Sequence, residues 1–275
     1  MSKLTYSLIL AGLAGLSSIS ALAADAPAPA QGGVTQHKED VHVIPATEHT
    51  LTGNVGLFSQ YIYRGITQTN EKPALQGGFD YAHSSGFYAG IWGSNVSWIS
   101  DPVNGVSASL ELDTYFGFKN SFAGDFSYDV GFLRYNYPGS YPAGFVKPDT
   151  NEIYGALGYK WITAKYSHSL GDTFGVDNAT NTNYIDLSAN FEVADKLMLG
   201  LHAGKQTYKG NIGGVSNDTL FTYTDYKVSL TKDINGYMVG VAYTDTDAAD
   251  SGYFVPATGK NIGRSQFIVS VSKSF

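Results

Sequence analysis

The sequence has 275 residues, a formal net charge of −7 and no cysteine. An acidic chain is not expected to bind nucleic acid, and a chain without cysteine has neither disulfides nor thiolate metal sites. Aromatic residues make up 14% of the chain and charged residues only 15%, yet no segment beyond the N-terminus has the run of about 18 apolar residues that a membrane-spanning helix needs. The composition excludes an α-helical membrane protein and suits one large β domain with an apolar outer surface.

The N-terminus is predicted to be a secretory signal, residues 1–23. Lys3 precedes a short apolar stretch that ends in Ala-Leu-Ala at 21–23, a small-residue cleavage pattern. Residues 24–50 are rich in Ala, Pro and Gly and then in mixed charges, without periodicity, and are expected to form a flexible periplasmic leader. We expect its histidines to be solvated rather than to bind metal, and we expect no metal and no cofactor elsewhere; these histidines are His37, His42 and His49.

Residues 51–275 form a succession of runs in which apolar and polar side chains alternate, as in strands with one wet face. In one run, Leu110, Leu112 and Phe116 fall on one face, and Glu111 and Asp113 fall on the other. The periodicity predicts strands at 52–63, 73–83, 86–98, 107–118, 125–137, 151–159, 162–169, 183–192, 196–206, 220–231, 236–244 and 265–275.

The links between these runs alternate in length along the chain. HSSG, KNSFAGD, VADK and KDING are short, as is a tight turn at 159–161, whereas the intervening links are mostly longer and polar. Outer-membrane barrels have short periplasmic turns and long extracellular loops, whereas a soluble β-sandwich has no reason to sort its loops in this way. The sequence therefore predicts an all-β fold, a single transmembrane antiparallel β-barrel of about 12 strands. Counts of ten or fourteen stay open because the turn within GALGYKWITAKY has no typical turn residue.

Aromatic residues gather near the ends of the predicted strands. Rings with one apolar and one wet edge favour the membrane interface, so we expect them to form the girdles of the barrel. The residues concerned are Tyr61, Tyr63, Tyr88, Trp98, Tyr135, Tyr137, Trp161, Tyr237 and Tyr243.

The chain closes on SQFIVSVSKSF, in which Phe267, Val269, Val271 and Phe275 fall on one face. A terminal aromatic on a closing strand resembles the C-terminal signature of bacterial outer-membrane proteins. Phe275 is therefore expected to act as the signal by which the C-terminal strand meets the barrel-assembly machinery. Lys273 departs from that signature, and its long side chain would reach the interface.

The stretch GNVGLFSQYIYRGITQTNEKPALQGGFDYAHSSGFYAGIWGSNV carries more than periodicity. Its YRGI at 63–66, QGG at 76–78 and GFYAG at 86–90, together with Ser59, Tyr61, Pro73-Ala74 and Trp92, resemble the TorF-like porin family of proteobacteria, conserved outer-membrane proteins of largely unknown function. The resemblance implies a location in the bacterial outer membrane, contact with the lipid bilayer, and a porin role.

Tyr63, Arg64 and Gly65 form the centre of this motif, where the first strand is expected to end and an extracellular loop to begin. Glycine allows a sharp bend at that point. Arg64 is expected to anchor the loop through an ion pair, with Asp80 or Glu111 as possible partners, or to contact a passing solute.

Assigning the apolar face of each run to the outside leaves a mainly acidic set of side chains pointing inward. A negative lumen lowers the barrier for cations, so the sequence predicts a passive diffusion channel for small hydrophilic solutes with a weak cation preference. The predicted pore-lining residues are Gln60, Asp80, Glu111, Asp113, Asp129, Lys165, Asp186, Asn190, Glu192, His202, Asp225 and Lys227.

Two other classes of function stay open at this point. A barrel of about twelve strands is intermediate in size, so paired charges crossing its interior would give a non-conducting structural or surface-interaction barrel. An outer-membrane hydrolase is the third class, since His83-Ser84-Ser85 and the triplet SHS at 167–169 hold suitable residue types. Neighbours in a strand point to opposite faces, so the sequence favours no enzyme.

Overall fold

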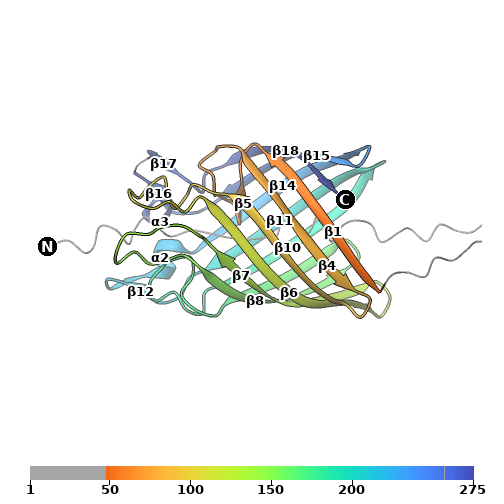
Figure 1. Cartoon of the computed structure of the whole chain (residues 1–275), viewed down its shortest axis with the longest axis horizontal. Coiled ribbons are helices and arrows are strands. Elements are labelled where there is room, and N and C mark those ends of the chain that lie inside the picture. Colours follow the sequence, from red (N-terminus) through yellow and green to blue (C-terminus); the bar gives the residue numbers. More distant parts are fainter. Residues whose placement is uncertain (1–47, 257) are drawn as a thin grey trace, which may run out of the picture.

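The computed structural model describes residues 48–256 and 258–275, which form a closed antiparallel barrel of twelve strands (Figure 1). The signal and most of the leader predicted from the sequence lie outside the described residues. The strands of the barrel are β1 (His49–Phe58), β4 (Ala74–His83), β5 (Phe87–Asn95), β6 (Leu110–Phe122), β7 (Phe126–Asn136), β8 (Thr150–Tyr159), β9 (Ile162–Ser169), β10 (Asn183–Ala194), β11 (Leu197–Thr207), β14 (Tyr223–Ile234), β15 (Tyr237–Thr246) and β18 (Gln266–Ser274).

Short and long links alternate as predicted, which sorts them to opposite ends of the barrel (Figure 1). The short turns are 84–86, 123–125, 160–161, 195–196 and 235–236. The long links carry small elements, namely β2 (Ile62–Tyr63), β3 (Ile66–Thr67), β12 (Asn211–Ile212), β13 (Val215–Ser216), α2 (Asn217–Phe221), α3 (Asp250–Tyr253), β16 (Phe254–Val255) and β17 (Lys260–Asn261). Among the described residues, no helix has the length and apolar character to cross a membrane.

The turn that the sequence marked least clearly is present. Tyr159 pairs with Ile162, and Lys160 takes a left-handed backbone with a φ of 53°. Lys196 and Asn235 adopt the same conformation in other short turns, with φ values of 54° and 55°. Left-handed residues suit tight hairpins because their twist matches that of the flanking strands, and the pairing on both sides of β8 and β9 holds Lys160 there without a glycine. The strand count of twelve is therefore confirmed.

The first and last strands close the barrel. β1 pairs with β18 from Asn54↔Ser274 to Phe58↔Ser270, and Phe275 and Gly53 exchange backbone hydrogen bonds of 2.8 and 2.9 Å. The ring of Phe275 lies over Gly53, where an added Cβ would come within 2.6 Å of a ring carbon. The terminal aromatic thus covers a glycine on the outer face of the first strand.

The outer face of the barrel is apolar. Large side chains that alternate along the strands are exposed, among them Leu57, Leu75, Phe79, Phe116, Val130, Leu157, Ile185, Val228, Val241 and Val269. A closed barrel that exposes aliphatic and aromatic residues from strand after strand has the surface that lipid chains cover. The protein is therefore a transmembrane β-barrel of the bacterial outer membrane.

Most of the aromatic residues expected in the girdles instead lie inside. Tyr61, Tyr63, Tyr88, Trp98, Tyr135 and Tyr137 are each 9% exposed or less, and all except Tyr88 join a hydrophobic core at the long-loop end. Trp161 and Tyr237 are exposed beside short turns. The girdle interpretation was wrong for the residues of this core because long loops folding over the barrel supply a second apolar environment at the strand ends. It was wrong for Tyr88 because this side chain faces the interior, where its hydroxyl donates to Asp129.

The first strand also differs from its prediction. β1 begins at His49, within the segment expected as leader, and ends at Phe58 instead of continuing to residue 63. Residues 59–67, which we term the inner hairpin, leave the wall and contain β2 and β3, which pair through Ile62↔Thr67 and Tyr63↔Ile66. The alternation of Tyr61 and Tyr63 continues the pattern of a strand, so periodicity alone did not mark this departure.

Candidate functional site

The inner hairpin folds into the barrel interior. Tyr61, Tyr63, Arg64 and Ile66 are all buried, and their partners lie on strands from opposite sides of the wall. Tyr61 donates a hydrogen bond of 2.8 Å to Glu111 Oε1 on β6, and the hydroxyls of Tyr63 and of Tyr135 on β7 are 3.3 Å apart. The hairpin therefore narrows the lumen toward the long-loop end.

Arg64 anchors the hairpin through an ion pair with Glu152 on β8. Its two terminal nitrogens donate to the two carboxylate oxygens over 3.1 and 2.9 Å, and one of them also donates to Gln206 Oε1 over 2.7 Å. The guanidinium lies 4.2 Å from the ring centre of Tyr184. A bidentate pair of this kind is strong and directional, and both side chains are nearly fully buried.

An ion pair was predicted for Arg64, but Asp80 and Glu111 were the wrong partners. Glu111 is occupied by Tyr61, and Asp80 lies nearer the short-turn end of β4, where it accepts a hydrogen bond from Tyr115. The alternation of side chains could have identified Glu152 as an interior residue. Ile153 and Leu157 face outward, so Glu152 lies on the inner face of β8.

Gly65 forms the tip of the hairpin and contacts the far wall. Its φ is 80°, and a Cβ at this position would lie 2.7 Å from the Cβ of Asp225 on β14. Both the left-handed backbone and the close approach require glycine here. The expectation of a sharp bend at Gly65 is met, although the chain bends into the barrel rather than out of it.

Interior tyrosines lie against the wall over glycines of neighbouring strands. A Cβ added to Gly90 would collide with the ring of Tyr115, and one added to Gly117 would collide with Tyr88. Gly131 and Tyr154 repeat the arrangement, with the hydroxyl 2.5 Å from the added Cβ. These glycines are therefore needed to let large rings lie along the inner surface.

The hydroxyls of these tyrosines turn toward interior carboxylates. Tyr88 donates to Asp129 over 2.6 Å, Tyr115 donates to Asp80, and Tyr184 donates to Asp225 over 2.9 Å. A hydroxyl donor stabilises a carboxylate without neutralising it. The interior thus keeps negative charge beside its aromatic surface.

His202 on β11 lies between two of the acids. Its Nδ1 is 3.0 Å from Asp186 Oδ2, and its Nε2 is 2.8 Å from Asp225 Oδ1. Ser188 is 3.3 Å from Nδ1 but donates its proton to Asp186. With a carboxylate facing each nitrogen, the ring is placed to donate from both, which makes this a charge cluster and not a nucleophile–base pair.

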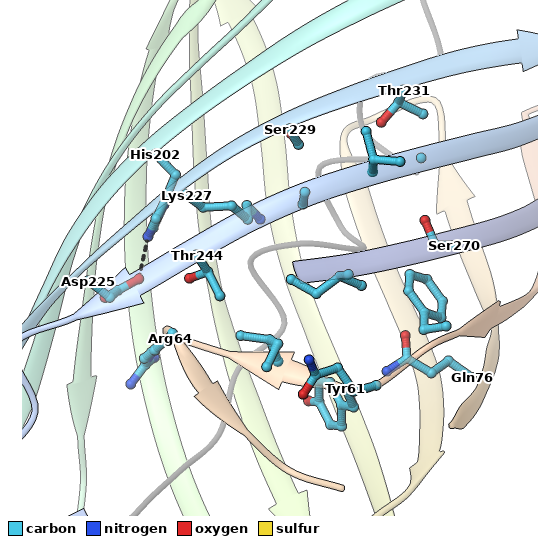
Figure 2. Close-up of a pocket in the computed structure, with 18 residues that line it drawn as sticks. Tyr61, Arg64, Gln76, His202, Asp225, Lys227, Ser229, Thr231, Thr244 and Ser270 are labelled. Carbon is cyan, nitrogen blue, oxygen red and sulfur yellow. Dashed lines mark hydrogen bonds and ion pairs between the residues drawn. The ribbon is translucent and has the colours of Figure 1, made fainter. Parts of the chain in front are cut away.

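A cavity of about 120 Å³ lies between the inner hairpin and the wall formed by β11, β14, β15 and β18 (Figure 2). Tyr61 and Arg64 approach it from the hairpin, and His202, Asp225 and Lys227 approach it from the wall. Hydroxyls and amides also line it, from Gln60, Gln76, Ser229, Thr231, Thr244 and Ser270, together with the apolar residues Phe58, Ile62, Val241, Ala242 and Ile268. The cavity offers both donors and acceptors to a hydrophilic guest.

The predicted pore-lining residues lie at different levels of the barrel. Glu111 and Asp113 are fully buried beside the hairpin, whereas Asp80 and Asp129 lie toward the short-turn end with partial exposure. Glu192 lies close to a short turn, and its carboxylate accepts a hydrogen bond from the backbone N–H of Lys196. The structure brings Asp186, His202 and Asp225 together in one cluster. Lys227 and Gln60 line the cavity. Of the remaining two residues, Lys165 lies over the ring of Tyr154, and Asn190 lies beside Gly200.

The serine–histidine triplets suggested for a hydrolase do not converge. Ser167 and Ser169 are buried, whereas His168 lies on the opposite side of β9, stacked on the exposed ring of Tyr166. His83 contacts its own neighbour Ser85 at the short turn, with 2.7 Å between Nδ1 and Oγ.

Comparison with solved structures gives distant likenesses. The KdgM porin in complex with disordered oligogalacturonate matches at 8% identity with a TM-score of 0.48, over 82% of this chain and 99% of that one. The NanC porin matches at 9% identity and 0.47, with the same coverage. OprD of Pseudomonas aeruginosa matches at 15% identity and 0.39, over 82% of this chain and 66% of that one.

No curated protein sequence matches this chain. A family model described as a bacterial protein of unknown function, Gcw_chp, matches residues 42–275. The match takes in the whole described barrel, including the inner hairpin and the closing strand. The chain therefore belongs to the bacterial family of unknown function Gcw_chp.

Proposed function

We propose that this protein is a porin-like channel for small hydrophilic solutes, with a weak preference for cations, in which the inner hairpin sets the narrowest part of the lumen. The proposal is carried by one observation: the interior holds carboxylates that hydrogen bonds orient but ion pairs do not neutralise. None of the ion pairs among the described residues includes Asp80 or Asp129.

The position of these two acids supports a role in permeation. Both lie toward the short-turn end, away from the hairpin, and their partners Tyr115 and Tyr88 are interior side chains. The charge of Asp129 is the less free of the two, because Lys119 stands opposite it in the register of β6 and β7. Net negative charge in a narrow aqueous lumen attracts cations and repels anions.

Planar-bilayer recording of the refolded protein under a salt gradient tests the proposal. We expect discrete conductance steps and a reversal potential that favours cations. Asp80→Asn combined with Asp129→Asn should move the reversal potential toward zero, whereas Glu111→Gln should change it less because Glu111 is fully buried behind Tyr61. Asp101→Asn, in a long loop outside the barrel interior, is the matched control.

A second candidate function is favoured by the depth at which the hairpin is packed. Tyr61, Tyr63 and Ile66 contribute to the hydrophobic core at the long-loop end, which would suit a non-conducting structural or surface-interaction barrel. The same recording separates the two functions. A barrel that folds and inserts but gives no conductance under any gradient contradicts the channel and leaves the plugged barrel.

A further inference from the structure

Two histidines and a glutamate lie together outside the lumen, at the short-turn end of β1 and β4. His49 and His83 are direct partners in the register of these two strands, and both are on the outer face that Leu75 and Phe79 share. Glu48 precedes β1, and its carbonyl accepts a hydrogen bond of 2.9 Å from the N–H of Ser84. Barrel pairing therefore fixes the backbones of all three residues with respect to one another.

Both imidazole rings are oriented by a second partner. Nδ1 of His49 is 2.8 Å from the hydroxyl of Tyr81, and Nδ1 of His83 is 2.7 Å from Oγ of Ser85. For His49, donation from Nδ1–H to the hydroxyl of Tyr81 leaves the lone pair on Nε2, an arrangement by which metal-binding histidines are held. Nδ1 of His83 also accepts a hydrogen bond of 3.1 Å from the backbone N–H of Ser85, so the lone pair of that ring lies on Nδ1. The ring of His49 also stacks on Tyr81, with 5.9 Å between centres.

We propose that Glu48, His49 and His83 form a binding site for a divalent transition-metal ion of the zinc type. One donor atom from each of the three residues lies within 4.8 Å of the others. Around a tetrahedral zinc ion with bonds of about 2.0–2.1 Å, donors are separated by roughly 3.4 Å, so small side-chain rotations complete the site. Two imidazoles and one carboxylate suit zinc, copper or nickel better than calcium or magnesium.

The surroundings favour a bound cation. Among the described residues, Glu48 takes part in no ion pair, so its charge is available to a metal. Leu51 is the first outward apolar residue beyond His49 on β1 and is 72% exposed, so the cluster lies at the end of the apolar face of this strand. A fourth coordination position would thus face the aqueous edge of the membrane.

An ion at this position would join the start of β1 to the end of β4. Residues 49–52 of β1 have no pairing partner on β18, because that pairing begins farther along β1. Only β4 holds them. A metal clip would therefore stabilise the part of β1 that has one neighbouring strand. This role does not depend on whether the lumen conducts.

Isothermal titration calorimetry of the refolded protein with Zn²⁺ tests the site. We expect one ion per barrel, with binding at least ten-fold weaker in His83→Ala and undetectable in His49→Ala/His83→Ala. Tyr81→Phe removes only the orienting hydroxyl and should weaken binding by about ten-fold, the usual effect of losing such a partner. Heat-modifiable mobility on electrophoresis shows that each variant is folded.

His168→Ala is the matched control. His168 is also an outer-face histidine stacked on a tyrosine, with 6.3 Å between the ring centres, but among the described residues it belongs to no group of three possible metal ligands. It should bind zinc as the unmodified protein does. Equal affinity in the double variant would overturn the proposal and would point to His37 and His42 instead. Binding that is weak and unchanged in every variant would also overturn it.

Discussion

A single carboxylate, Glu71, joins the first long loop to the last. Its Oε2 is 2.7 Å from Lys260 Nζ, and its Oε1 accepts hydrogen bonds from Arg264, one of them over 3.0 Å. Partial burial works to raise the pKa of Glu71, but the hydrogen bonds and charges of Lys260 and Arg264 outweigh it and lower that pKa. All three side chains are partly exposed, so each of the two ion pairs contributes no more than about 1 kcal/mol to the stability of the folded state.

The lowered pKa gives this contact a defined pH dependence. A carboxylate with a depressed pKa in the folded state stabilises the contact above its ordinary pKa of 4.5, and the stabilisation is lost as the pH falls through the lower, folded value. We expect amide exchange in residues 258–266 to be slower in the unmodified protein than in Glu71→Gln at pH 6, with the difference vanishing near pH 3. Comparing both proteins at each pH cancels the intrinsic pH dependence of exchange. A difference that persists at pH 3 would contradict the assignment.

At the residue level, alternation in the sequence predicted which side chains of a strand face the interior, as it did for Glu111, Asp129 and Asp225. It did not predict which of them meet. The pairing of Arg64 with Glu152 joins residues 88 positions apart, and the clustering of His202 with Asp186 and Asp225 depends on three strands lying in register. Such contacts depend on how distant strands are arranged in the closed barrel, so they cannot be predicted from the sequence pattern of a single strand.

The inner hairpin is the element that most determines the shape of the lumen. Two tyrosines hold its sides, Gly65 allows its tip to approach β14, and Arg64 fixes it to β8 and β11. Arg64 and Glu152 are both buried, so removing one leaves a buried charge without its partner. The usual cost of breaking such a pair is about 3–5 kcal/mol, enough to release a short hairpin from its docked position.

We therefore expect Arg64→Ala to raise single-channel conductance, or to produce conductance if the unmodified barrel gives none. Arg134→Ala is the control, since Arg134 is 42% exposed and pairs with Asp149 in a long link. Removing both partners, in Arg64→Ala/Glu152→Ala, should restore part of the stability lost in the single variant while leaving the lumen wide. Unchanged conductance in folded Arg64→Ala would show that the hairpin does not limit passage.

At the level of elements, the strands were predicted almost completely and the loops were not. Alternation over about ten residues is a local signal, so even the turn at Lys160, which lacks turn chemistry, was located from a change of parity. The inner hairpin was missed because Tyr61 and Tyr63 continue the alternation of β1 while the backbone turns inward. Burial there comes from residues on β6, β7 and β8, which a single segment cannot reveal.

At the level of the whole molecule, closure depends on the pairing of β1 with β18. The Phe275 backbone bonds to Gly53, and its ring fills the space that Gly53 leaves on the outer face. The role of Phe275 as a signal to the barrel-assembly machinery stays a prediction, and its packing gives it a second, purely physical role at the same seam.

Phe275→Ala should therefore lower the yield of folded barrel in the outer membrane. Phe267→Ala is the control, because Phe267 is on the same strand and the same outer face and is 76% exposed. Refolding each variant into lipid vesicles without assembly proteins separates the two roles. A loss confined to cells supports the signal, a loss in both settings supports packing over Gly53, and normal yields in both would contradict either role.

The pairing between β1 and β18 also means that the barrel can close only after β18 has been made. β1 pairs with β4 along its whole length, from His49↔His83 to Phe58↔Ala74, but its other edge stays open until the last residues of the chain arrive. A product that stops before β18 leaves β1 and β15 as unpaired edges in lipid, where no water can satisfy their backbone groups. Chains that lack β18 therefore have no stable partial barrel to form in the membrane, so insertion of this fold is all-or-none with respect to its last strand.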